Sequence, residues 1–256
     1  GKQIAIALGG TSVEPGTDDP LEKRAANIVQ EMALAANMPV PSLFVLNEEP
    51  GINAFAAGTS PANAVVAVTR GALITLDRDQ LQGVIGHEFS HILNGDMRLS
   101  IRLAAMLRGI TFIGDVGGVL LRSSSHRRRY RSTKNDNQGA AVALGLGLYL
   151  VGLLGGLMAG LIKSAISKQK EYLADASAVQ FTRNPEGIGN ALKVIGGQDS
   201  GTLVEAGRAE EMSHLFFGQV QHRLWSGFAT HPPIEKRIHR IDPRWDGVFL
   251  AASPSE

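Results

Sequence analysis

The strongest constraint on how this chain can fold is a run of 24 residues, Gly139 to Ile162, that contains no charged side chain. As an α-helix the run would be roughly 36 Å long, which is enough to cross a lipid bilayer. Within it, Gly152, Gly156 and Gly160 form two overlapping steps of small residues four apart, a pattern typical of tightly packed membrane helices. A buried helix of a soluble core, or a contact in an oligomer, would also explain the run. The segment therefore predicts a long apolar helix that lipid or protein must cover.

A second apolar segment, Ile101 to Leu121, precedes this run. It contains three charged residues, Arg102, Arg108 and Asp115, which are costly in hydrocarbon. Arg108 and Asp115 are seven apart and can share a protected face. We expect residues 101–162 to form an apolar helical hairpin with a basic loop at 123–138, inserted into a single domain of residues 1–256. Residues 251–256 have the composition of a frayed tail.

The rest of the chain has the patterning of an α+β, mainly helical protein. Asp19, followed by proline, predicts the start of a helix that ends near Asn37. A second helix is expected to begin at Asp77, where Gln80 suits a capping box, and to stop at Gly95. Between the two helices lie three short β-like runs that suggest a small meander: Leu43–Leu46, Ile52–Ala57 and Ala64–Val68.

Composition excludes several classes of function. Lys and Arg number 25 against 24 Asp and Glu, so no strongly basic field favours nucleic acid as a partner. The basic cluster Arg127–Arg131 is better explained by a solvated loop or by contact with anionic lipid headgroups. The absence of cysteine excludes disulfides, thiolate metal sites and cysteine nucleophiles.

The sequence His87-Glu88-Phe89-Ser90-His91 lies inside the helix expected after Asp77. Residues four apart on a helix project from one face, so both imidazoles can bind one zinc ion. Glu88 lies beside the first ligand and can act as the general base toward a zinc-activated water. A core helix with two hydrogen-bonded histidines is the alternative, but it would bury three polar side chains beside an apolar stripe, which is costly without partners. The motif therefore predicts a catalytic site with one zinc ion per chain.

A catalytic zinc site needs a third protein ligand, and the best candidate is Glu171. Glu171 and Asp175 are four apart on a predicted helix and share one face. Glu171 can bind the metal while Asp175 accepts a hydrogen bond from the second imidazole N–H of a ligand histidine. Taken alone, such a pair is most often a solvated face, and it gains weight from the histidine motif. His231, which precedes two prolines, can either polarise the substrate oxyanion or cap the helix that follows.

Five motifs, in this order, make the chain similar to the HtpX-type membrane metallopeptidases, relatives of the CAAX prenyl proteases. The motifs are Asn53-Ala54-Phe55-Ala56, Val84–His91, Asn94-Gly95-Asp96, Glu171–Asp175 and His231-Pro232-Pro233. The resemblance covers residues 20–242 and implies a gluzincin-type fold with a small sheet, an exposed edge strand, and a zinc ion between two helices. It also implies a membrane-associated endopeptidase with Glu171 as third ligand, and we expect a role in protein quality control.

The edge strand that the resemblance implies contains Asn53, Ala54, Phe55 and Ala56, where a polypeptide substrate would pair through its backbone. An ordinary core strand with Phe55 buried is the alternative, and both can hold. Two rival functions stay open: a non-catalytic, zinc-stabilised membrane scaffold, and a protease specific for prenylated peptides. Glu88 favours catalysis over the scaffold, because a structural zinc site needs no base.

Topology limits how the hairpin meets a membrane. His91 and Glu171 must reach one zinc ion, so the chain between them crosses a bilayer twice or not at all. Two crossings would place the basic loop opposite the active site, and its arginines favour the cytoplasmic side, whereas the resemblance implies a cytoplasmic active site. We therefore expect a membrane-associated hairpin in contact with lipid, with two crossings favoured over none. The sequence does not determine the oligomeric state.

Overall fold

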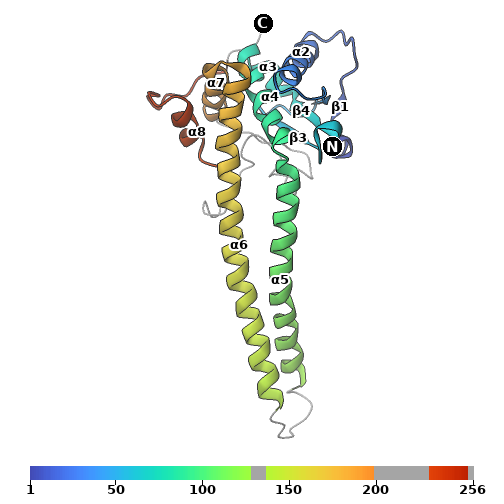
Figure 1. The fold of residues 1–256 in the computed structure, drawn as a ribbon, viewed down its shortest axis with the longest axis vertical. Coiled ribbons are helices and arrows are strands. Elements are labelled where there is room, and N and C mark those ends of the chain that lie inside the picture. The colour runs from blue at the N-terminus through green and yellow to red at the C-terminus, as the bar shows by residue number, and fades with distance from the viewer. Residues whose placement is uncertain (128–136, 199–230, 253–256) are drawn as a thin grey trace. The chain divides into compact units, whose positions relative to one another are not determined.

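A computed structural model of the chain describes residues 1–127, 137–198 and 231–252 (Figure 1). The chain divides into two compact units, one formed by Gly1–Arg98 with Ser167–Glu256 and the other by Leu99–Ile166. Within the described residues the first unit contains a four-stranded sheet and several helices, and the second consists of two helical segments. The predicted α+β, mainly helical class is therefore confirmed.

Two helices of the first unit, α2 (Pro20–Ala35) and α4 (Arg78–Leu93), begin and end where the sequence predicts. Asp19 accepts hydrogen bonds from the first backbone N–H groups of α2, and Asn37 adopts the left-handed conformation (φ 51°) just after that helix. Asp77 and Gln80 form a capping box at the start of α4. The remaining short elements of the unit are α1 (Lys2–Ala7), η1 (Pro61–Asn63), α3 (Arg70–Thr75), α7 (Pro185–Gly196) and α8 (Ile234–Ile241).

The sheet has the strand order β1-β2-β4-β3. Its strands are β1 (Thr11–Ser12), β2 (Ser42–Leu46), β3 (Ala54–Ala57) and β4 (Val65–Thr69). β2 and β4 are parallel, whereas β1 and β3 run antiparallel to their neighbours. The predicted meander is therefore wrong, because β4, which is buried along its whole length, takes the central position and leaves β3 at the edge. The expected edge strand is present.

Alternate side chains of each strand point to opposite faces of the sheet. Both faces are covered, each by its own hydrophobic core. One set, which includes Val45 and Val68, lies in the main core with α2, α4 and α7. The other set, which includes Phe44 and Phe55, lies in a smaller core with Ala5 of α1. Phe55 is therefore a core residue, as the alternative interpretation of the edge strand expected.

Helix α4 is central to the first unit and contacts α2, α7 and β3. Its predicted apolar stripe is buried throughout: Leu81, Val84, Ile85, Phe89 and Ile92. Gly83 lets α7 come close, since a Cβ at this position would lie 2.5 Å from the backbone nitrogen of Ile188. The His-Glu-x-x-His segment therefore lies in the part of α4 that packs against α2, α7 and β3.

The second unit contains most of α5 (Asp96–Arg127) and the first part of α6 (Asn137–Thr182). Both helices are long and apolar enough to cross a membrane, yet only 6% and 11% of their most apolar windows is buried within the chain. Among residues 1–127, 137–198 and 231–252, the two helices are not packed as the buried helices of a soluble core would be. Glycines bring the two helices into contact, because a Cβ on Gly152 would lie 2.3 Å from the Cα atom of Gly114.

The charged residues of α5 are placed differently from expectation. Arg108 and Asp115 pair at 3.8 Å, but their side chains are 78% and 61% exposed. Their shared face is therefore not protected by the described residues of this chain. Residues 128–136 of the expected basic loop and 253–256 of the expected tail lie outside the described part of the chain.

Candidate metal centre

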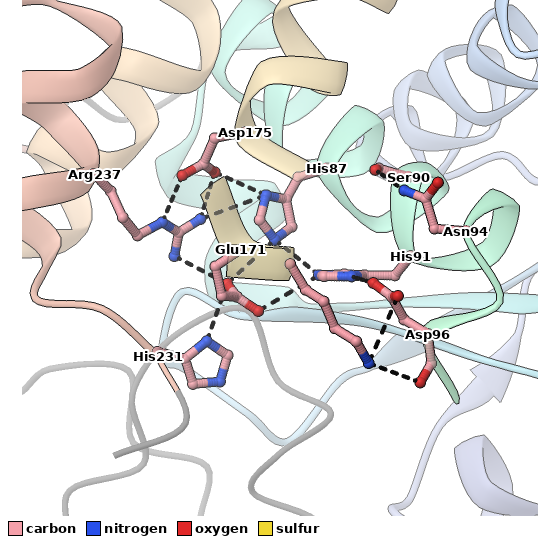
Figure 2. Close-up of polar contacts among 10 residues, drawn as sticks. His87, Ser90, His91, Asn94, Asp96, Glu171, Asp175, His231 and Arg237 are labelled. Carbon is pink, nitrogen blue, oxygen red and sulfur yellow. Dashed lines mark hydrogen bonds and ion pairs between the residues drawn. The ribbon is translucent and has the colours of Figure 1, made fainter. Parts of the chain in front are cut away.

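Two imidazole rings from α4 lie close together at the centre of the site (Figure 2), with their planes at 82° to one another. The Nε2 atoms of His87 and His91 are 3.1 Å apart. The Nδ1 atom of His87 lies 2.8 Å from Oδ1 of Asp175, and that of His91 lies 2.7 Å from Oδ2 of Asp96. Because an ionised carboxylate only accepts hydrogen bonds, each ring donates its Nδ1–H outward. Both Nε2 lone pairs therefore point into the same space.

Glu171, on α6, completes a group of three potential ligands. Its Oε2 atom lies 3.5 Å from Nε2 of His87, and its Oε1 atom lies 3.6 Å from Nε2 of His91. Ligand atoms arranged tetrahedrally at roughly 2.0–2.2 Å from a zinc ion are about 3.3–3.6 Å apart. The observed spacings are close to this range, and one ligand atom from each residue lies within 4.8 Å of the others.

The electrostatics of the group favour a cation between the rings. Oε2 of Glu171 is buried, and none of its contacts has the geometry of a hydrogen bond among the described residues. Burial lowers the pKa of His87, but the carboxylates of Asp175 and Glu171 outweigh this effect and raise the pKa to about 9. Positive charge is thus stabilised here, and two imidazole nitrogens with one carboxylate are a donor set that suits zinc.

Arg237, on α8, is a site residue that the sequence analysis missed. Its guanidinium donates hydrogen bonds to both carboxylate oxygens of Asp175, at 2.9 and 2.7 Å. Burial raises the pKa of Asp175, but the charge of Arg237 outweighs it and lowers the pKa to about 2. Asp175 therefore stays ionised and accepts from His87. The sequence gives one indication of this role: Arg237 lies on the same helical face as Ile234 and Ile241, where an apolar residue would be expected.

Asp96, the partner of His91, was also missed. It is the first residue of α5 and follows Gly95, whose positive φ of 65° allows the sharp turn after α4. The turn brings the Asp96 carboxylate back to a histidine five residues earlier. The motif Asn94-Gly95-Asp96 is one of the five that carry the family resemblance, but the sequence assigns no role to Asp96.

The general-base candidate Glu88 is buried, with 2% of its surface exposed. Its carboxylate accepts a hydrogen bond from the backbone N–H of Ala56 in β3 and is influenced by the charges of His91 and His87. Burial raises the pKa of Glu88 above its ordinary value. A raised pKa helps a carboxylate to take up a proton, which is what a general base must do.

His231 lies at the site rather than at a helix end. Its Nδ1 atom is 3.0 Å from Oε2 of Glu171, and the side chain is buried. Burial raises the pKa of Glu171, but His231 and His87 outweigh it and hold this pKa well below its usual range. The N-cap of α8 is Pro233, and no side chain caps the helix. The helix-capping alternative for His231 is therefore wrong.

The four residues expected to bind substrate lie in or next to β3. Ala54, Phe55 and Ala56 belong to the strand, and Asn53 immediately precedes it. The strand is shorter than expected because Asn53 does not take part in strand pairing. Its backbone N–H donates to the hydroxyl of Thr69, and its side-chain oxygen accepts from the N–H of Ala54. Both Asn53 and Phe55 are buried, so a ligand along this edge would meet mainly backbone.

A histidine pair on one helix, a carboxylate from a second helix and a buried glutamate beside an edge strand form an arrangement of the kind that metallopeptidases use. Comparison with known proteins agrees. The model of peptidase family M48 matches residues 20–244. The Protease HtpX homolog of Streptococcus equi subsp. equi is 41% identical over 215 residues, covering 84% of this chain and 71% of that protein. The Streptococcus pyogenes serotype M28 homolog is 43% identical over 216 residues, with the same coverage.

The crystal structure of Ste24p from S. mikatae has a similar fold, with a TM-score of 0.52 and 17% sequence identity. The similarity covers 93% of this chain and 52% of that one, so the chain spans about half the length of this structural neighbour. The chain belongs to peptidase family M48, among its HtpX-like members. It is therefore a metalloprotease.

Proposed function

We propose that the protein is a zinc-dependent endopeptidase that holds one zinc ion per chain through His87, His91 and Glu171. The observation that carries the proposal is the convergence of two Nε2 atoms and one carboxylate, with both outer ring nitrogens engaged by other carboxylates. A bound zinc ion would lower the pKa of a water molecule and polarise the carbonyl of the substrate. The test is to measure cleavage of an unfolded protein, together with bound zinc, in the wild type and in Glu88→Gln.

In this proposal Glu88 takes a proton from the attacking water and delivers it to the departing amine. The hydrogen bond from Ala56 N–H fixes the carboxylate between the ligands and β3. His231 donates a hydrogen bond to the developing oxyanion. Its Nε2 atom supports this role, because it is buried and has no hydrogen-bond partner within the described ranges.

We propose that polypeptide substrates add to the edge strand β3 at Ala54 to Ala56. Among the described residues, no strand lies on the outer side of β3. The contact between Ala56 and Glu88 would place a paired peptide beside the base. With Asn53 and Phe55 buried, recognition would act through backbone hydrogen bonds, which are common to all sequences. A protease of this kind suits unfolded polypeptides, which supports a role in protein quality control.

Replacing Asp175 with alanine should weaken zinc affinity about 10–100-fold, the usual effect of losing a partner that orients a ligand histidine. The reason is that the Nδ1–H of His87 would lose its acceptor. Zinc affinity is measured by competition with a chromophoric chelator at fixed pH. Asp79→Ala, at an exposed carboxylate in the first turn of α4, serves as control and should bind zinc normally. Unchanged affinity in Asp175→Ala would contradict the orienting role.

We propose that α5 and α6 associate with a membrane and cross it twice, with the active site on the cytoplasmic side. The support is that both helices are long, apolar and almost unburied within the chain. Because the chain contains no cysteine, single cysteines can report sidedness without background labelling.

Cysteines placed at Ser124 and Ser200 should react with a membrane-impermeant thiol reagent from opposite sides of the membrane. In intact cells only one of the two variants should be labelled, and in opened cells both should be. The reason is that α6 lies between the two positions in the sequence. If α6 crosses the bilayer, the two positions are on opposite sides of it. Labelling of both variants from the same side would rule out two crossings.

A further inference from the structure

We propose that Asp96 is a positioning residue for the metal ligand His91, and that Lys170 holds Asp96 in place. The inference rests on the proposed zinc site and adds two residues to it. Figure 2 shows the Asp96 carboxylate on the Nδ1 side of His91, at a distance of 2.7 Å between Oδ2 and Nδ1. This contact fixes the tautomer that leaves Nε2 of His91 free to bind metal.

Lys170 contacts Asp96 in two ways. Its Nζ atom lies 3.6 Å from Oδ1 of the carboxylate and donates a hydrogen bond of 3.2 Å to the backbone carbonyl of the same residue. The two carboxylate oxygens thus have different partners, one the ammonium and the other the imidazole. The side chains of Lys170 and Asp96 are only 12% and 14% exposed, so solvent screens this pair less than a surface ion pair.

The other proposed histidine ligand, His87, has the same arrangement of a cation, a carboxylate and an imidazole ring. Asp175 accepts from Nδ1 of His87, and Arg237 binds both oxygens of Asp175. In each case a cation distant in sequence contacts a carboxylate, and that carboxylate contacts the Nδ1 side of a ring. The repetition of this arrangement at both rings is the observation that assigns a role to Asp96.

The two arrangements differ in strength. Arg237 makes two short hydrogen bonds from a rigid fork, whereas Lys170 makes a longer point contact to its carboxylate. The His91 side is also less buried, with 21% of that side chain exposed against 0% for His87. Loss of Lys170 should therefore weaken metal binding less than loss of Asp96 itself.

A purely structural role for Asp96 makes different predictions. A carboxylate at the first residue of α5 can stabilise the helix start through the helix dipole. Removing it would then lower the stability of the protein without changing how the metal is held. Measurements made on the metal itself separate the two roles.

The experiment measures zinc affinity of the full chain by chelator competition at fixed pH. Asp96→Ala should weaken binding about 10–100-fold, Lys170→Met should weaken it less, and Lys170→Arg should restore most of the loss. Combining Asp96→Ala with Lys170→Met should add nothing to Asp96→Ala alone, because Lys170 acts through Asp96. Lys193→Met is the matched control, since Lys193 pairs with Asp242 at 3.1 Å and is similarly buried; it should bind zinc like the wild type.

Cobalt substitution gives a second measurement. The visible absorption of the cobalt form should change in Asp96→Ala and stay unchanged in Lys193→Met, because only the first alters the orientation of a ligand ring. Wild-type affinity and spectrum in Asp96→Ala, or additive losses in the double variant, would overturn the inference. A wild type that binds neither zinc nor cobalt would instead contradict the proposed site, so the two failures are distinguishable.

Discussion

The Glu88→Gln variant should retain its zinc and lose about 2 to 4 orders of magnitude in turnover, the usual scale for loss of a general base. Glutamine has nearly the same shape and can still accept the hydrogen bond from Ala56 N–H, but it cannot take up a proton. Glu88 is buried, with 2% of its surface exposed. Turnover is measured on an unfolded protein substrate, with zinc determined by elemental analysis in the same sample.

Glu31→Gln is the control for this variant, because Glu31 is a half-exposed carboxylate that pairs with Arg78 on the surface. It should have normal activity. Near-normal turnover in Glu88→Gln would refute the mechanism. Loss of zinc from Glu88→Gln would show that Glu88 is a ligand instead of a base.

The His87→Ala variant should lose most of its bound metal and, with it, all measurable protease activity. The site would be reduced to one imidazole and one carboxylate, and a three-ligand zinc site needs all three for tight binding. The loss also leaves Asp175 without the imidazole that it orients. Elemental analysis of the purified variant gives the metal content directly.

His239→Ala is the matched control, because His239 lies on the exposed side of α8 and contacts Trp245 rather than the metal site. It should keep a full complement of zinc. Full zinc occupancy in His87→Ala would remove the basis of the whole ligand assignment.

Local features of the fold were predictable because they depend on residues within one or two helical turns. The capping residues of α2 and α4, the apolar stripe of α4 and the four-residue spacing of its histidines all act over such distances. Strand order was not predictable in the same way. The parallel pairing of β2 with β4 skips β3, and it depends on which strand is best buried when both faces of the sheet are covered. β1, with two residues, is too short to give any periodic signal.

The apolar helical hairpin likewise has features that the sequence predicts and others that depend on tertiary packing. Length and composition predicted two long apolar helices, and the structure contains them. Whether Arg108 and Asp115 are shielded depends on what packs against α5, and the described residues leave that pair exposed. Spacing of seven residues predicted that the two charges share a face of the helix, but not what surrounds that face.

The sequence by itself indicated the candidate ligands His87, His91 and Glu171, their spacing on each helix, and the metal that such donors suit. Tertiary structure decided which of the two histidines meets Asp175, and it alone brought Arg237 and Lys170 to the site. Asp175 meets His87 across 88 residues, Arg237 meets Asp175 across 62, and Lys170 meets Asp96 across 74. Contacts at such separations follow from the packing of several helices around α4. No local pattern encodes them, because their free energy comes from the burial of the whole unit rather than from neighbouring residues.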